Sequence, residues 1–154
     1  QYSPDGSYLG FIYAAKDESR QVWMMSTSGG KIKKLTNEPS GVSQFKWQPG
    51  HRGIAYLSRE TTSAREKELN KRGYGFIYYE ENLKDLNLWI ASFDKDWGLS
   101  SAKQLTEEVM CWDIEFNAQG TQIAASISPE NLIDQKPIAA GHRVNFGVLT
   151  RQFR

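Results

Sequence analysis

Hydrophobic and polar positions alternate with a period of two along several short stretches of this chain. Residues 8–13 read Tyr-Leu-Gly-Phe-Ile-Tyr, so bulky apolar side chains would fall on both faces of an extended segment. A period of two indicates β-strands. Bulk on both faces predicts a sheet that packs between two neighbouring sheets.

A tight turn precedes this strand, and the combination of turn and strand occurs three times. Residues 2–11 contain an aromatic, the turn Ser-Pro-Asp-Gly and then alternating apolar positions; residues 47–56 repeat this order, and residues 116–125 repeat it more loosely. Proline and glycine suit the corners of such a turn. Successive copies lie 45 and 69 positions apart. Strand repeats of about 40 to 50 residues are typical of propeller blades.

A second repeated phrase accompanies the first. Residues 21–36 and 87–106 both contain an apolar strand with a tryptophan, a glycine turn and a final Leu-Thr pair. This order predicts two strands joined by a hairpin. Trp23 and Trp89 should therefore occupy equivalent positions. A further strand before each following turn brings the unit to four strands, the content of one blade.

These repeats predict an all-β fold: a β-propeller fragment of about three four-stranded antiparallel blades. Residues 1–46 would form one blade, residues 47–115 a second blade with an inserted segment at 59–85, and residues 116–154 a partial blade, all in one incomplete propeller domain. Closed propellers have about 4 to 8 blades. We therefore expect the 154 residues to be a piece of a longer protein.

An arc of three blades would leave the outer faces of its first and last sheets uncovered. We expect Phe11, Tyr13 and Ile123 to face water in the isolated chain. Such faces, together with unpaired strand edges, favour association. Either further chain or a second copy would then cover them.

Composition narrows the classes of partner. The formal net charge is +1, from 19 basic and 18 acidic residues, which offers no strong field for nucleic acid or an anionic membrane. No long apolar run predicts a membrane span. The single cysteine, Cys111, is interpreted as a small buried apolar residue. The compartment stays open between bacterial periplasm and cytoplasm.

The inserted segment is the least repetitive part. Residues 59–73 are charged and favour a helix that Gly73 would end, and residues 76–83 are an aromatic run that ends in adjacent carboxylates. The simpler interpretation is a solvated excursion packed on the rim. The alternative is a recognition element, since loops on rigid scaffolds often carry binding residues.

The Ser-Pro-Asp-Gly turn, the Gln-Val-Trp strand, Gly-Gly, Leu-Thr and the returning aromatic resemble TolB-type propeller repeats. The pattern is shared by the Tol-system periplasmic protein and by the N-terminal propellers of prolyl oligopeptidase family serine peptidases. Residues 71–74, 79–83 and 86–89 are similar to a segment of acylaminoacyl-peptidase-like and dipeptidyl-peptidase-like members. The resemblance implies that this chain is the non-catalytic propeller of a serine peptidase, which gates peptide substrates for a hydrolase domain elsewhere in the parent protein.

The sequence shows no catalytic machinery of its own. It has no Gly-x-Ser-x-Gly, and His51 and His142 have no nucleophile at motif spacing. No cofactor or metal is expected: residues 94–98 open like a calcium loop, but the later ligand positions are not filled, so a hairpin tip is the better interpretation. The tryptophans at repeat-equivalent positions favour blade packing over nucleic-acid stacking.

The family resemblance implies one binding pair. In the dipeptidyl-peptidase branch a Glu-Glu pair holds the free amino terminus of the substrate, and Glu80 and Glu81 match it through the preceding Tyr79. Asn82 stands where a third glutamate is sometimes found. The expected partners are thus a hydrolase domain and a peptide substrate. The alternative is a TolB-type propeller that binds proteins and has no enzymatic half.

Overall fold

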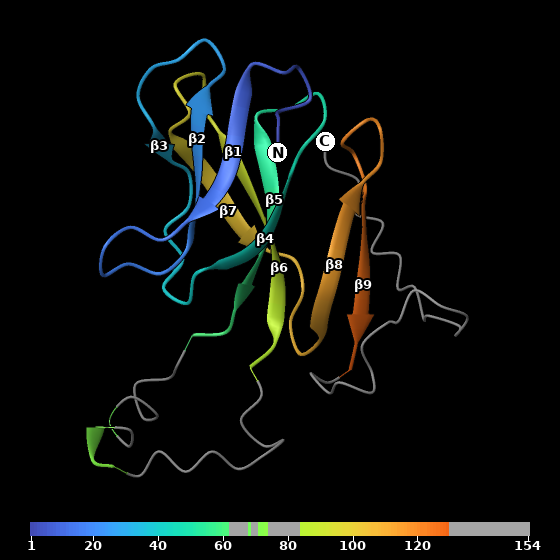
Figure 1. The fold of residues 1–154 in the computed structure, drawn as a ribbon. Helices are drawn as coiled ribbons and strands as arrows, with labels where there is room; N and C mark the ends of the chain where they lie inside the picture. The colour runs from blue at the N-terminus through green and yellow to red at the C-terminus, as the bar shows by residue number, and fades with distance from the viewer. Residues whose placement is uncertain (62–67, 69–70, 74–83, 130–154) are drawn as a thin grey trace.

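The computed structural model describes residues 1–61, 68, 71–73 and 84–129. These residues form three antiparallel sheets that lie side by side (Figure 1). The first sheet has the order β1-β2-β3, the second β4-β5-β6-β7 and the third β8-β9. The strands are β1 (Tyr8–Tyr13), β2 (Gln21–Ser26), β3 (Lys33–Lys34), β4 (Val42–Trp47), β5 (Gly53–Arg59), β6 (Leu86–Phe93), β7 (Leu99–Gln104), β8 (Met110–Phe116) and β9 (Ile123–Ser128). The predicted all-β, propeller-like architecture is confirmed.

The three turns that the sequence repeats occupy the same place in the three sheets. The residue before each turn pairs with the first apolar residue after it: Tyr2 with Leu9, Trp47 with Ile54, and Phe116 with Ile123. Tyr2 thus marks, in the first sheet, the place that β4 and β8 fill in the other two. The sequence repeat is therefore also a structural repeat.

Trp23 and Trp89 lie at equivalent positions, as predicted. Trp23 in β2 pairs with Phe11 and Lys34, and Trp89 in β6 pairs with Tyr56 and Gln104. In each case the partners lie one strand before and one strand after the tryptophan. β2 and β6 are therefore the same strand of two successive blades.

The division into sheets is offset from the predicted units by one strand. The strand that the repeat placed at the end of the first unit is β4, and its hydrogen-bonded neighbour is β5 of the second sheet. Likewise β8 pairs with β9. The unit boundaries at 46/47 and 115/116 thus lie within or at the end of strands that belong to the following sheet.

The core lies between the sheets rather than within one of them. Val22 and Met24 of the first sheet share a buried cluster with Ile54 and Tyr56 of the second. Gly10 allows this close packing, because a Cβ there would lie 2.7 Å from the Trp47 ring and 2.8 Å from the Phe45 ring. Burial of such apolar surface is the main stabilising term.

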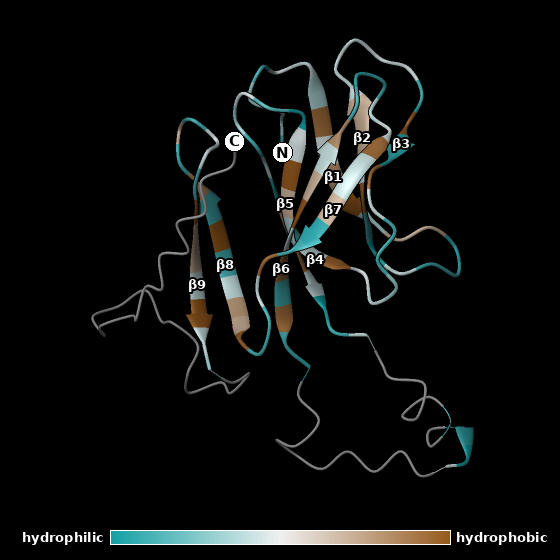
Figure 2. Ribbon diagram, turned by 180° about the vertical axis from the view of Figure 1, so that it is seen from behind, coloured by the Kyte–Doolittle hydropathy of each residue, from teal (hydrophilic) through white to brown (hydrophobic). Residues whose placement is uncertain are grey.

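The second interface between sheets repeats the first at equivalent positions. Ala55 and Leu57 of β5, which correspond to Gly10 and Ile12, pack in a second buried cluster with Ile123 and Ala125 of β9. In each sheet, the face that carries Gly10 and Ile12, or their counterparts Ala55 and Leu57, therefore packs against the next sheet. The next sheet contributes its opposite face to this contact. The outer strand β7 is pale to teal in Figure 2 and is mostly exposed.

The burial of the outer faces differs in part from the prediction. Tyr13 is 55% exposed and Phe11 is half-buried, as expected for an uncovered face of the first sheet. Ile123 is buried, at 3% exposed, and its expected exposure was wrong. The reason is the strand offset: Ile123 points toward the second sheet, not away from it.

The inserted segment leaves the second sheet at the paired ends of β5 and β6, Arg59 and Leu86. Of its described residues, Glu68 and Lys71 are helical, Arg72 forms an ion pair with Glu68 at 3.0 Å, and Gly73 has a φ of 79°. These agree with the predicted helix and its glycine stop. In the described part of the chain, no helix is long and apolar enough to cross a membrane.

Candidate functional site

A polar strip connects the first strands of two adjacent sheets. Gln44 Nε2 donates a hydrogen bond of 2.5 Å to Asp113 Oδ1, and Lys46 Nζ lies 2.5 Å from Glu115 Oε2. Both pairs join residues 69 positions apart, which is the repeat spacing, so the strip is built twice from the same two positions of the unit. We call Gln44, Lys46, Asp113 and Glu115 the inner strip.

The inner strip lies where neighbouring sheets approach each other through their first strands. β8 packs against β4, β5 and β6 of the second sheet, whereas β3 and β7, at the other ends of their sheets, make no comparable contact with another sheet among the described residues. In a closed propeller the blades surround a central channel, and one end of each sheet lies toward it. The inner strip gives the end of these two sheets that is formed by β4 and β8 a hydrophilic surface.

The electrostatics of the inner strip are mixed. It carries one cation and two carboxylates, and the Lys46 side chain is 26% exposed against 68% for Glu115. An ion pair with this exposure contributes little to stability, about 0 to 1 kcal/mol. The polar groups of the inner strip can instead form hydrogen bonds with polar solutes such as peptide backbones.

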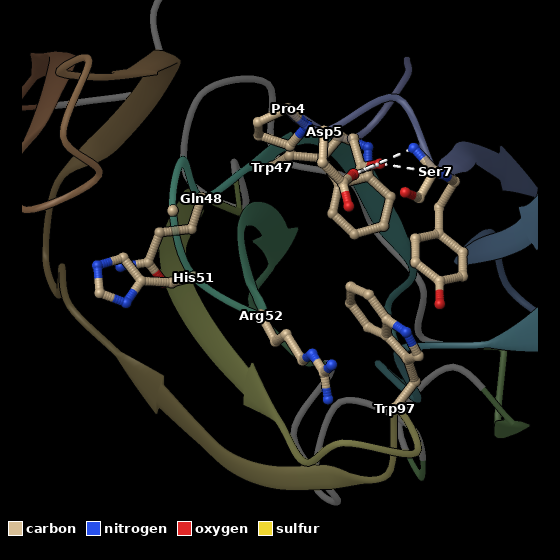
Figure 3. Close-up of a pocket in the computed structure, with 11 residues that line it drawn as sticks. Pro4, Asp5, Ser7, Trp47, Gln48, His51, Arg52 and Trp97 are labelled. Carbon is tan, nitrogen blue, oxygen red and sulfur yellow. Dashed lines mark hydrogen bonds between the residues drawn. The ribbon is translucent and has the colours of Figure 1, made fainter.

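A pocket of about 390 Å³ lies at the turn end of the first two sheets (Figure 3). Residues of the turn that starts at Ser3 and residues of the second turn, at Gln48, both line it. Its lining consists of Ser3, Pro4, Asp5, Ser7, Tyr8, Trp47, Gln48, Gly50, His51, Arg52 and Trp97. This is the turn end of β5, at Gly53, and the inserted segment leaves from the other end, at Arg59.

Trp97 is the central aromatic of this pocket. Its ring centroid lies 4.9 Å from that of Tyr8 and 5.7 Å from that of Trp47, both edge to face. Trp97 has a φ of 61°, a left-handed conformation that is uncommon for a bulky residue. The hairpin tip holds it there, since Asp94 Oδ1 accepts hydrogen bonds from the N–H groups of Asp96 and Gly98.

Charged side chains approach the pocket from two sides. Asp5 Oδ1 accepts hydrogen bonds from Ser3 Oγ at 2.6 Å and from the Ser7 N–H at 3.1 Å, and these bonds lower the pKa of Asp5. Arg52 extends toward Trp97, whereas His51 points away from it (Figure 3). Asp5 is thus committed to its own turn, while the guanidinium of Arg52 faces the aromatic wall.

The residues that the sequence singled out do not gather at one place. Glu80, Glu81 and His142 lie outside the described residues, so the amine-binding pair stays a prediction. His51 lies at the edge of the pocket. Residues 94–98 form the hairpin between β6 and β7, as interpreted, and among the described residues no group of three His, Cys, Asp or Glu side chains could hold a metal.

Cys111 is fully buried, in agreement with its interpretation. Burial raises the pKa of its thiol to about 12, with a smaller contribution from the nearby charge of Asp113. A thiol with this pKa is almost entirely protonated at neutral pH. Cys111 therefore belongs to the packing between the second and third sheets.

Sequence reasoning missed both the inner strip and the pocket. The signal for the inner strip was present: Gln44 and Lys46 stand at the same repeat positions as Asp113 and Glu115. The pocket had a weaker signal, because it joins two turns and a hairpin tip that are distant in sequence. Only the packing of the first sheet on the second brings Trp97 beside Tyr8.

Comparisons with known proteins place this geometry in a class. No family model matches the chain. A solved structure of a protein from Agrobacterium tumefaciens that was assigned as TolB superposes with a TM-score of 0.57 and 16% identity, covering 86% of this chain and 39% of that one. The chain therefore has a TolB-like β-propeller fold.

One curated relative adds a sequence match. The uncharacterized peptidase YuxL of Bacillus subtilis (strain 168) is 43% identical over 54 residues, which are 35% of this chain and 8% of that protein. The match thus spans a small part of the relative's length. The chain is a TolB-like propeller with local sequence similarity to a peptidase.

Proposed function

We propose that this chain is the non-catalytic propeller portion of a serine peptidase of the prolyl oligopeptidase family. It would gate or position peptide substrates for a hydrolase domain of the same parent protein. The observation that carries the proposal is the 43% identity to a peptidase over 54 residues. The TolB-like fold supports it, because that family uses such propellers.

The inner strip supports a role in the passage of peptides. A peptide backbone carries a donor and an acceptor at every residue and needs polar partners when it leaves bulk water. Gln44 and Asp113 offer such partners, and Lys46 and Glu115 offer both signs of charge. The inner strip would let extended peptides pass along the central channel of the propeller without leaving their backbone donors and acceptors unsatisfied.

The first experiment compares the chain with the full-length gene product that contains it. We expect the full-length protein to hydrolyse short chromogenic peptides but not folded proteins, and the 154-residue chain alone to hydrolyse neither. A full-length product without peptidase activity would contradict the proposal. So would turnover by the chain alone that is lost when one of its own serines is substituted.

A substitution tests the inner strip itself. In the full-length protein, Lys46→Glu would leave three carboxylates together, so kcat/KM should rise for peptides with Lys or Arg and fall for peptides with Asp or Glu, each by roughly threefold to tenfold. Lys31→Glu, at an exposed lysine outside the inner strip, is the matched control with the same change in net charge. Equal effects of the two substitutions would show that the inner strip does not influence which peptides are hydrolysed.

A second candidate function is a TolB-type propeller that binds protein partners and has no enzymatic half. The structural similarity to a protein assigned as TolB favours it. The sequence adjacent to this chain separates the two candidates, because a Gly-x-Ser-x-Gly after the last blade belongs to a hydrolase domain. Its absence, together with recovery of a stable protein complex, would favour the binding module.

A further inference from the structure

We propose that the pocket between the first two turns binds an aromatic carboxylate. The ring of the ligand would lie against Trp97, and its carboxylate would reach the guanidinium of Arg52 (Figure 3). The volume of about 390 Å³ falls within the range of small-molecule sites. None of the four residues of the inner strip lines this pocket, so this inference does not depend on the proposed function.

Arg52 is not required by the turn in which it stands. The equivalent residues of the other two copies are Ser7 and Thr121, which are small and use their backbone N–H groups to close the turn. The backbone of Arg52 has a similar structural task, since its carbonyl accepts a hydrogen bond of 2.8 Å from Phe93 N–H. A serine or threonine could do the same, so the long cationic side chain is an addition to the repeat.

The guanidinium of Arg52 is available to a ligand. The side chain is exposed, and within residues 1–61 and 84–129 the structure gives it no ion pair and no side-chain hydrogen bond. A guanidinium presents donors in a fork that matches both oxygens of a carboxylate. Asp5 does not neutralise it, because that carboxylate accepts hydrogen bonds from Ser3 and Ser7 on another side of the pocket.

Trp97 is placed at a conformational cost. The corresponding hairpin of the first sheet has Gly29 and Gly30 at positive φ, where glycine carries no penalty. The second sheet places a tryptophan at φ 61° instead, and such backbone strain tends to gather at ligand sites. With the rings of Tyr8 and Trp47 packed edge to face against it, Trp97 is a rigid wall for a planar ligand group.

Calorimetric titration of the 154-residue chain tests the proposal with two probes. N-acetyl-L-phenylalanine carries the carboxylate, and N-acetyl-L-phenylalanine amide is its uncharged counterpart. We expect the acid to bind with a Kd lower than that of the amide by roughly tenfold or more. No binding of the acid at about 10 mM, or equal affinity for both probes, would overturn the proposal.

Two substitutions assign the binding to this pocket. Arg52→Gln should reduce the difference between acid and amide to less than about twofold, whereas Arg20→Gln, at an exposed arginine outside the pocket, should leave it unchanged. Trp97→Gly suits the positive φ and should weaken both probes severalfold. An Arg52→Gln protein that still prefers the acid, or an equal loss in Arg20→Gln, would refute the assignment.

Discussion

At the scale of single residues, the contacts between sheets depend on a few positions where no side chain fits. Gly120 is the sharpest case. Its φ is 68°, and a Cβ there would overlap the carbonyl oxygen of Pro49. Gln48 reinforces the same contact, because its Nε2 donates a buried hydrogen bond of 2.7 Å to the Gly120 carbonyl. The third turn is thereby fastened directly to the second.

Gly120→Ala should therefore destabilise the chain by about 3 kcal/mol, through both the clash and the unfavourable φ. Gly6→Ala is the matched control, because Gly6 has a similar φ of 72° but no atom within 4 Å of the place that a Cβ would occupy. It should cost only about 1 kcal/mol. Urea unfolding followed by tryptophan fluorescence measures both; equal losses would mean that the contact with Pro49 is unimportant.

The thiol of Cys111 gives a second prediction at this scale. Because only the thiolate is nucleophilic and burial raises the pKa of this thiol to about 12, the native chain should react with iodoacetamide at pH 8 roughly a hundredfold or more slowly than the urea-unfolded chain. The native rate should rise with pH until the pKa is reached. A native rate equal to the unfolded rate would place Cys111 at the surface.

At the scale of elements, a buried threonine closes each of the two complete hairpins. Thr36 Oγ1 accepts a hydrogen bond of 2.9 Å from Val22 N–H and donates one of 2.8 Å to Gln21 Oε1. Thr106 does the same for Leu88 N–H at 2.8 Å, with a longer contact of 3.5 Å to Asn87 Oδ1. The Leu-Thr pair of the sequence repeat is thus a hydrogen-bonding device that continues each sheet beyond its last strand.

Thr36→Val keeps the side-chain shape but leaves the Val22 N–H and Gln21 Oε1 without this partner, so it should cost about 1 to 3 kcal/mol. Thr106→Val should cost less, because its second contact is long. Thr27→Val, which removes exposed hydrogen bonds only, should change stability by less than about 0.5 kcal/mol. Thermal unfolding of the three variants ranks their losses of stability. An unchanged stability of Thr36→Val would contradict the hydrogen-bonding role assigned to Thr36.

At the scale of the whole molecule, both interfaces pack one face of a sheet against the opposite face of the next sheet. One face of the first sheet has no such cover among the described residues. Ile54 and Tyr56 are buried by the first sheet, at 0% and 1% exposed. Their counterparts in the first sheet, Leu9 and Phe11, are half-buried, and Tyr13 is exposed beside Trp23. This aromatic face is equivalent to one that is covered in the next sheet.

The isolated chain should therefore associate through this face, and Tyr13→Lys should reduce that association in sedimentation velocity at matched concentrations. Leu99→Lys is the control, since Leu99 is 56% exposed against 55% for Tyr13 but lies on the outer strand β7. It should leave the sedimentation profile unchanged. A monomeric wild-type chain across a wide concentration range would show that this face needs no cover.

The sequence by itself determined the strands, the turns and their repetition, because these depend on local preferences: the period of two, proline and glycine at corners, and Gly-Gly in a hairpin. It also located Trp23 and Trp89 correctly, since equivalent positions in a repeat have equivalent neighbours along the chain. Only the tertiary structure decided which strand joins which sheet, since candidate hydrogen-bond partners of β4 lie on both sides of it in sequence. That choice buried Ile123, aligned Gln44 with Asp113, and brought Trp97 against Tyr8, because each of these contacts joins residues that are distant in sequence and meet only when the sheets pack.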